Sequence, residues 1–488
     1  MGHGIKIAEN PTRLSTPVQS DAACQVVVGR AQINLLDNPE DAVNKPILVT
    51  DFTEAVAKVG YSEDFDNYEI NQSIAMTFKN FAVAPIIFIN VLDPNKDSHV
   101  EKVNNVSQAI TDKKIALDVK GILLKSIKLT DSAEAGATVY TVDEDYVAAF
   151  DDDGNVLITI TEDGKLKDAE TVKVSYTKLK PSGVTTNDIV GGYNAATGTY
   201  KGIECIEKVF PVLNKVPAIL TAPGFSQEPV VMAALKAKSN GTNEVFKSIN
   251  ICDVPTDTCK TYDSVNAWKN ANSYTDKMTY LGWPMVKFGT KKVYASAHMS
   301  ALYANKIANL DSGVPCESPS NLDAGIQGCC LKDGTEVNLT IKQANVLNDC
   351  GVFTYINWQG WKSWGNNMAC YPSNNDVKDH FINVRNFFNW WANSFILTYF
   401  AQIDRNMKPR NLDRIVDTEN IRANGFAKNE NIAAAHIEYV SDSNPITSVI
   451  GGTIKFNQYL SCFVPMQEIV NELEYDVDAL QKVLFGGN

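Results

Sequence analysis

Histidine, serine and acidic side chains are the groups of this chain that could catalyse a reaction or bind a metal ion. The five histidines lie far apart, and none stands near a cysteine or an acid at the spacing of metal ligands. They are His3, His99, His298, His380 and His436. The sequence also contains no GxxxxGKS/T, GxGxxG, HExxH or GxSxG motif. We therefore predict that the chain is not an enzyme, with no catalytic residue, no metal site and no cofactor.

One histidine lies between two serines and resembles a nucleophile beside its base. His298 stands between Ser296 and Ser300. Residues so close in the chain rarely have the geometry of a catalytic pair, and no acid is placed to orient the imidazole. We predict that all three side chains pack in a core.

The acidic run DDDGN at residues 151–155 resembles the start of a calcium-binding loop. Oxygen-bearing residues fill positions one, three, five and twelve of such a loop, namely Asp151, Asp153, Asn155 and Glu162. Val156 stands where the loop requires glycine, and the following VLITIT is typical of a strand. The pattern favours a tight acidic hairpin over a calcium site.

The ten cysteines predict reduced thiols. They form no CxxC pair, and Cys329 and Cys330 are adjacent, which suits a disulfide between them poorly. We expect most of them to be buried.

The overall charge excludes two classes of partner. A net charge of -13 and a pI near 5.0 argue against a protein that coats nucleic acid or an anionic membrane. No stretch approaches the roughly 18 uninterrupted apolar residues of a membrane span, and no signal-like segment opens the chain. We predict synthesis and folding in a cytosol.

Three tryptophans lie close together around a glycine-containing loop. Trp358, Trp361 and Trp364 could stack on bases or sugars, but Lys362 is the only basic residue among them. We predict that they are buried under the loop.

Strand and helix patterns indicate an α/β layer interrupted by an all-β insertion. Residues 24–29 and 85–92 are typical of buried strands, and residues 72–81 have helical spacing. Residues 95–182 contain no cysteine and no tryptophan, and their strand-like segments alternate with turn signals. These segments span residues 114–119, 126–130, 138–142, 156–161 and 171–179. We predict an inserted β-sandwich.

Residues 375–403 are predicted to form one long helix, because apolar residues recur at three- and four-residue steps. The apolar residues expected on its buried face are Val377, Phe381, Val384, Phe388, Trp391 and Phe395. A basic turn follows, with Arg405, Lys408, Arg410 and Arg414, and Arg422 lies beyond it. Strands are expected near residues 433–440 and 452–463.

Both ends of the chain are predicted to be strand-like arms. Ile5, Lys6 and Ile7 form the first. Residues 468–478 form the second, with one mostly acidic face and an apolar face that contains Ile469, Leu473, Tyr475 and Val477. Neither has an obvious partner strand nearby in the sequence, and a lone strand leaves half of its backbone groups unpaired. We predict that the arms add to a sheet, in this subunit or in a neighbour.

Several segments, in order, resemble the contractile tail sheath proteins of myophages and R-type bacteriocins. The opening ENPTRLSTPVQSDAACQVVVGRA is similar to the beginning of that family, and NDIVGGYNAATGTYKGIECIEKVF with PAILTAPGFSQ is close to its most recognisable stretch. Four more segments follow in the order of the family: VYASAHMSALYANKIANLDSGVPCESPSN, ANVLNDCGV, WKSWGNN and FINVRNFFNW. Residues 316–330 depart from its commoner forms.

The resemblance implies an α+β multidomain fold. A subtilisin-like α/β core domain would occupy residues 21–94 and 183–374, with the β-sandwich inserted at residues 95–182. The segments that carry the protease triad are absent, so the core would be non-catalytic. An α+β domain would follow at residues 375–488. Extended arms at residues 1–20 and about 466–488 would link subunits.

The resemblance also implies a mechanical function. Subunits of this family stack helically around an inner tail tube, exchange strands, and contract to drive the tube through a cell envelope. The implied partners are further copies of the chain, the tube protein, and the baseplate and tail terminator proteins, without direct nucleic-acid contact or membrane insertion. The implied location is the tail of a virion or a bacteriocin particle, assembled in the bacterial cytoplasm. Genome ejection by a phage and membrane puncture by a bacteriocin both remain open.

Within this family assignment, the basic residues from Arg405 to Arg422 are predicted to face the inner tube. Two other interpretations make different demands on the structure. A degenerate subtilisin-like hydrolase requires a Ser-His-Asp set, and a monomeric carbohydrate-binding protein requires an exposed aromatic platform.

Overall fold

The computed structural model describes residues 18–19, 21–151 and 154–486. The predicted strand of Ile5, Lys6 and Ile7 lies outside these ranges. The described chain begins with β1 (Val18–Gln19), which pairs in parallel with β4 (Val83–Ala84).

An eight-stranded sheet forms the centre of the molecule, in the order β22-β21-β17-β16-β15-β2-β5-β3. Its six inner strands are parallel neighbours, and the two edge strands, β3 (Ile47–Val49) and β22 (Trp361–Trp364), pair antiparallel. The inner strands are β21 (Val352–Asn357), β17 (Thr279–Gly282), β16 (Ile249–Asp253), β15 (Ile219–Thr221), β2 (Gln25–Gly29) and β5 (Ile86–Asn90). The apolar runs that predicted β2 and β5 are buried on both faces, as is typical of parallel sheets. Both predictions are confirmed.

Apolar clusters and helices cover both faces of this sheet, and in β16 and β17 successive residues contribute to opposite clusters. Ile251 belongs to one cluster and Cys252 to the other, and Tyr280 and Leu281 divide in the same way. Helix α7 (Ala295–Ala308) packs into one cluster, whereas α5 (Pro229–Gly241), α6 (Tyr262–Ala271) and α8 (Ile341–Asn348) pack into the other. The predicted helix at residues 72–81 is present as α2 (Glu69–Ile74) and the π-helical turn that continues it to Asn80.

Smaller elements complete this part of the chain. Its remaining helices are α1 (Phe52–Val59), α3 (Thr186–Val190) and α4 (Val209–Leu213). Its remaining strands form a hairpin of β13 (Gly192–Asn194) with β14 (Thr199–Lys201), and a small sheet of β18 (Met285–Phe288), β19 (Lys291–Val293) and β20 (Gly328–Cys330).

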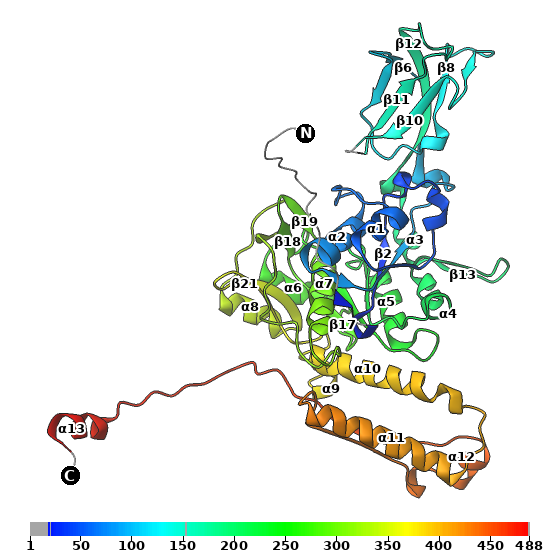
Figure 1. The fold of residues 1–488 in the computed structure, drawn as a ribbon. Helices are drawn as coiled ribbons and strands as arrows, with labels where there is room; N and C mark the ends of the chain where they lie inside the picture. The colour runs from blue at the N-terminus through cyan, green and yellow to red at the C-terminus, as the bar shows by residue number, and fades with distance from the viewer. Residues whose placement is uncertain (1–17, 20, 152–153, 487–488) are drawn as a thin grey trace, which may run out of the picture.

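Residues 100–179 form two further sheets around an apolar cluster of their own, which includes Ile115, Leu129 and Ile158. One sheet contains β7 (Lys114–Leu117), β10 (Tyr146–Phe150) and β11 (Val156–Ile160). The other contains β6 (Val100–Ala109), β8 (Lys128–Thr130), β9 (Val139–Tyr140) and β12 (Thr171–Leu179). Figure 1 shows this pair of sheets standing apart at one end of the molecule. The predicted acidic hairpin joins β10 to β11, and the backbone N–H of Asn155 donates to Asp151 Oδ1 at 2.8 Å.

Two antiparallel helices dominate the C-terminal region, α10 (Ile382–Tyr399) and α11 (Pro409–Lys428) (Figure 1). The hairpin of β23 (Ala434–Glu438) and β24 (Asn457–Ser461) packs beside α11, and α12 (Ile446–Ile450) lies between its strands in the sequence. Both predicted strands are present in shortened form.

The single long helix predicted for residues 375–403 is wrong. The structure divides it into α9 (Val377–His380) and α10, because Phe381 is extended and bridges to Asn367. Val384 and Trp391 are buried as expected, but Val377 is exposed on the short first piece.

Candidate functional site

The hairpin of β23 and β24 leaves both of its outer edges without a partner strand among the described residues. An edge strand presents a row of backbone N–H and C=O groups that another strand can pair with. Helix α11 packs beside β23, and its Asn420 side chain accepts from the backbone N–H of Ile437 at 3.0 Å and donates to its carbonyl at 3.2 Å. The outer edge of β24 can therefore accept a strand from another chain by backbone hydrogen bonding alone.

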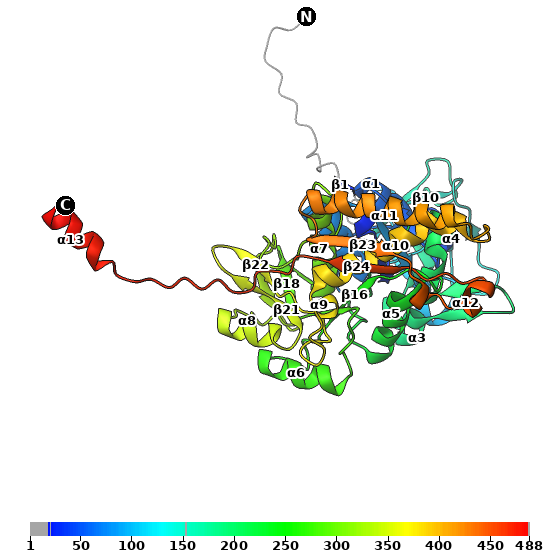
Figure 2. The ribbon, with the colours of Figure 1, turned by 90° about the horizontal axis from the view of Figure 1, so that it is seen from below.

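The segment after β24 leaves the body of the molecule. Figures 1 and 2 show residues 463–476 running outward to α13 (Val477–Phe485), far from the rest of the chain. Its apolar side chains face solvent: Ile469 is 79% exposed, Leu473 89% and Tyr475 72%. Exposed apolar side chains gathered on one segment mark an interaction site, since burying them in a partner is favourable.

The predicted strand at residues 468–478 is wrong at its C-terminal end. Residues 468–476 form no strand within the described chain, and Val477 begins a helix. The side chain of Asp476 caps α13 by accepting a hydrogen bond from the backbone N–H of Ala479 at 2.8 Å. Val477, Leu480 and Leu484 follow at helical spacing, which outweighs the alternating pattern that precedes them.

Helix α13 needs a partner surface. A helix of nine residues is marginal in water on its own, and its apolar residues Val477, Val483 and Phe485 are more than half exposed. The arm before it is acidic, with Glu468, Glu472, Glu474 and Asp476. The arm therefore offers apolar anchors and negative charge to a neighbour.

Four of the five predicted basic residues form an exposed group. Arg405 and Lys408 lie in the connection between α10 and α11, and Arg410 and Arg414 lie on the first turns of α11. This group carries positive charge on a chain whose net charge is -13.

The structure does not bring Arg422 into this group. Its guanidinium donates to Glu419 Oε2 at 3.1 Å and to Ser394 Oγ at 2.7 Å. It also lies 4.0 Å from the ring centroid of Trp391. Burial lowers the pKa of Arg422 even though Glu419 opposes the shift. Arg422 thus joins α11 to α10, and sequence reasoning missed this because both partners are distant or buried.

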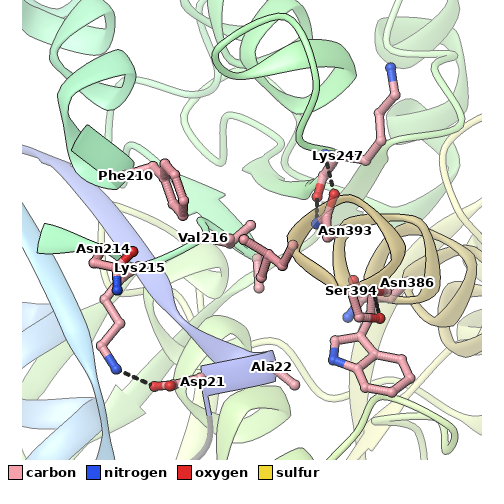
Figure 3. Close-up of a pocket in the computed structure, with 13 residues that line it drawn as sticks. Asp21, Ala22, Phe210, Asn214, Lys215, Val216, Lys247, Asn386, Asn393 and Ser394 are labelled. Atoms are coloured by element: carbon pink, nitrogen blue, oxygen red, sulfur yellow. Dashed lines mark hydrogen bonds and ion pairs between the residues drawn. The ribbon is translucent and has the colours of Figure 1, made fainter. Parts of the chain in front are cut away.

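A cavity of about 240 Å³ lies between α10, the loop after α4, and residues 21–22 (Figure 3). Its rim carries an ion pair between Lys215 and Asp21 at 2.6 Å. The side chain of Asn393 accepts from the backbone N–H of Lys247 at 2.8 Å and donates to its carbonyl at 2.6 Å. The serine on its wall, Ser394, donates to the carbonyl of Trp390 at 2.8 Å. Most of these polar groups have partners already, although the amide nitrogen of Asn386 has none among the described residues, and no nucleophile, base and acid converge on the cavity.

His298 is a buried core residue, as predicted. Its Nδ1 lies 2.8 Å from the Tyr355 hydroxyl and its Nε2 lies 2.7 Å from the Ala324 carbonyl. A carbonyl only accepts, so Nε2 carries the proton and Nδ1 accepts from the tyrosine. Burial lowers the pKa of His298 to about 4, which keeps the ring neutral.

Ser296 is bonded to a carboxylate that sequence analysis did not single out. Asp253, at the end of β16, accepts from the Ser296 hydroxyl at 2.6 Å, the Ser296 backbone N–H at 2.8 Å and the Ser226 hydroxyl at 3.0 Å. Burial raises the pKa of Asp253 to about 6 although these donors oppose the shift. The serine and the histidine of the SAHMS segment therefore serve different networks, and they do not form a nucleophile and base.

The tryptophan cluster is partly exposed, which corrects the prediction of burial. Trp361 and Trp364 lie in β22 and are half-buried, whereas Trp358 sits at the turn before that strand and is 59% exposed. A turn tip has no layer above it to cover a side chain. One exposed ring is less than the aromatic platform that sugar binding would require.

Within the described ranges, no three histidine, cysteine or acidic side chains converge closely enough to hold a metal ion. The helices in these ranges are too short or too polar to cross a bilayer. The ten cysteines all lie within the described ranges and are free, and eight are buried, as expected.

No family model matches the sequence. The chain is 24% identical over 506 residues to the tail sheath protein of Burkholderia phage BcepMu, and the match covers 100% of this chain and 99% of that protein. A prophage major tail sheath protein of Pseudomonas aeruginosa is 27% identical over 281 residues, which are 55% of this chain and 69% of that protein. The resemblance to contractile tail sheath proteins is confirmed.

Solved structures share the fold of this sheath-like chain. A chain of the anti-feeding prophage baseplate matches with a TM-score of 0.58 at 12% identity, over 98% of this chain and 99% of that chain. A chain of the contracted PVC sheath, from an extracellular contractile injection system, matches with a TM-score of 0.56 at 12% identity and the same coverage. The mixed α/β multidomain fold is thus shared over nearly the whole length.

Replacing Arg422 with methionine should destabilise the C-terminal region by about 3 to 5 kcal/mol, because Glu419 would be left buried without its counter-charge. Thermal and urea unfolding measure the loss. Adding Glu419→Gln should recover part of it. The exposed control Arg414→Met should change stability by no more than about 0.5 kcal/mol. Equal effects at positions 414 and 422 would contradict the assignment.

Asp253→Asn should change how stability depends on pH. The pKa of Asp253 is about 6 in the folded chain and about 3.9 when unfolded, so the folded state binds this proton more tightly. The stabilisation of the folded state by the proton on Asp253 is fully present below about pH 4 and is lost as the pH rises through 6. Relative to the wild type, the variant should therefore gain up to about 3 kcal/mol between pH 4 and pH 7 in urea unfolding. The exposed control is Asp257→Asn, and parallel profiles for the wild type and Asp253→Asn would contradict the prediction.

Proposed function

We propose that this chain is the repeating subunit of a contractile tail sheath, which polymerises helically around an inner tube and contracts to drive that tube through a cell envelope. The observation that carries the proposal is the C-terminal arm, which is apolar, acidic and free of the body that it belongs to. An exposed apolar segment of this kind does not stabilise a monomeric protein. In a polymer, the same segment can link each subunit to its neighbour.

The arm suits strand exchange between neighbours. Fully extended, residues 463–476 span roughly 45 Å, which is enough to cross from one subunit to the next. The hairpin offers the outer edge of β24 on every copy, because Asn420 of α11 already bonds the backbone of Ile437 in β23. One arm adding to one such edge in each neighbour gives head-to-tail contacts that do not close, and such contacts build helical assemblies. The residues proposed for this exchange are Ile469, Leu473 and Tyr475, with Val477 acting through α13, and Ile5, Lys6 and Ile7 at the other end of the chain.

The exposed basic group is proposed to face the inner tube. Arg405, Lys408, Arg410 and Arg414 are held at one end of the α10 and α11 pair, which keeps their positions defined. Exposed ion pairs are worth about 0 to 1 kcal/mol each and weaken with salt. A ring of such contacts can align subunits during assembly and still release the tube on contraction.

The central sheet domain and the inserted pair of sheets are proposed to have a structural, non-catalytic role. The parallel central sheet supports a subtilisin-like, non-catalytic core, and the networks around His298 and Asp253 support a packing role for that core. The two sheets of residues 100–179 have their own cluster and stand apart, which suits a position on the outer surface. Baseplate and terminator proteins are the proposed partners at the two ends of a tail, in a phage or a bacteriocin particle.

Ending the chain at Met466 should leave a soluble subunit that forms no tubes, because each copy loses its tether. Electron microscopy and sedimentation of the purified protein measure this. The matched control ends at residue 485, which retains α13 and should form tubes like the full chain. Removing residues 1–20 should have the same effect as the longer C-terminal truncation. Normal tubes from the chain that ends at Met466 would overturn the proposal of strand exchange.

Reversing charge with Arg405→Glu, Lys408→Glu and Arg410→Glu should prevent assembly on the tube while free subunits still polymerise. The control reverses three exposed lysines of the insertion, with Lys113→Glu, Lys114→Glu and Lys128→Glu, and should assemble normally. Co-sedimentation with tubes over a salt series provides the measurement. Assembly of the first variant with unchanged salt sensitivity would place the basic group away from the tube.

A further inference from the structure

Two of the ten cysteines differ from the others in their surroundings. Cys316 and Cys462 are half-buried, whereas the other eight are buried. Cys316 lies in the loop after α7, and Cys462 is the first residue after β24, where the C-terminal arm begins. The two thiols thus mark the junction between the core and the arm.

One buried side chain holds the two cysteine segments together. The amide nitrogen of Asn383, on α10, donates to the carbonyl of Cys316 at 3.2 Å and to the carbonyl of Phe463 at 3.2 Å. Because one nitrogen bonds both carbonyls, the two backbone segments lie next to each other. Both cysteine side chains also pack against the cluster that contains Phe387 and Trp391. Disulfides require such neighbouring backbones, with Cα atoms about 4.4 to 6.8 Å apart.

A small oxidant can reach Cys316 from a cavity that also contacts Phe463, the residue after Cys462. A cavity of about 710 Å³ is lined by Cys316 and Phe463, together with Ser312 and Asn431. The Asn431 amide lies 3.8 Å from Cys316 Sγ, so the sulfur faces this cavity wall. Burial raises the pKa of Cys462 to about 12 and also raises that of Cys316, so both thiols react slowly at neutral pH.

We propose that Cys316 and Cys462 form a reversible disulfide that fastens the root of the C-terminal arm to the loop after α7. A low-molecular-weight disulfide such as oxidised glutathione is the oxidant. One thiolate attacks it, forming a mixed disulfide and releasing one glutathione thiol, and the second cysteine then displaces the other. The two protein thiols lose two electrons and two protons, and one glutathione disulfide becomes two thiols.

The bond lies within one chain and does not depend on the proposed function. It closes a long loop, so it should stabilise the fold by restricting the unfolded chain. It would also fix the point from which the arm leaves the body, while residues after 463 keep their freedom to reach a neighbour.

The test treats the purified full chain with oxidised glutathione at mildly alkaline pH, where more thiol is ionised. After alkylation in denaturant, mass spectrometry should find eight of the ten cysteines alkylated and one peptide pair joined through residues 316 and 462. A faster band on a non-reducing gel, removed by dithiothreitol, and a higher melting temperature should accompany it.

The variants Cys316→Ser and Cys462→Ser should each reduce the cross-linked fraction by at least an order of magnitude. The control Cys205→Ser should keep it, since serine can still donate to the Asn44 carbonyl that this thiol contacts at 3.3 Å. If a variant does not fold, the peptide map of the wild-type chain decides. Ten alkylated cysteines after treatment, or a cross-link that joins any other pair, would overturn the proposal.

Discussion

The structure depends on one constraint: some backbone and apolar groups have no partner within the described chain, and pairing them with a partner is energetically favourable. These groups are the backbone groups on the outer edge of β24 and the exposed apolar residues of the arm. The body does not need these groups to be paired in order to fold, because apolar clusters cover both faces of the central sheet. The unmet groups therefore remain available until copies meet.

The proposed function requires a rigid body, and the buried polar networks of the body favour rigidity. Asp253 accepts three hydrogen bonds from two segments, His298 bridges α7 to β21 and the Ala324 loop, and Arg422 fixes α11 on α10. Partly satisfied networks of this kind would allow alternative packings, whereas satisfied ones favour one arrangement. Residues that resemble catalytic groups in the sequence thus hold packed elements together. The proposed disulfide would add a covalent link where the C-terminal arm begins.

Some of the fold could be predicted because it follows from local patterns. The runs that became β2 and β5 contain uninterrupted apolar stretches, VVV at residues 26–28 and IIFI at residues 86–89, and such stretches are typical of a strand buried on both faces. The strand β6 was missed because most of its side chains are exposed and polar, so its sequence lacks an alternating pattern. The break at Phe381 was missed because its cause, a bridge to Asn367, is a tertiary contact.

The sequence by itself determined the likeness to contractile sheaths, the burial of most cysteines, the acidic hairpin between β10 and β11 and the existence of a separate C-terminal arm. These follow from residue type, order and short-range spacing. Only the tertiary structure decided that Arg422 turns inward to Glu419 and Trp391, that Asp253 rather than His298 holds Ser296, and that the arm ends in α13. The physical reason is that charge pairing, burial and hydrogen bonding act between residues that folding brings together. Local periodicity in the sequence does not identify those partners.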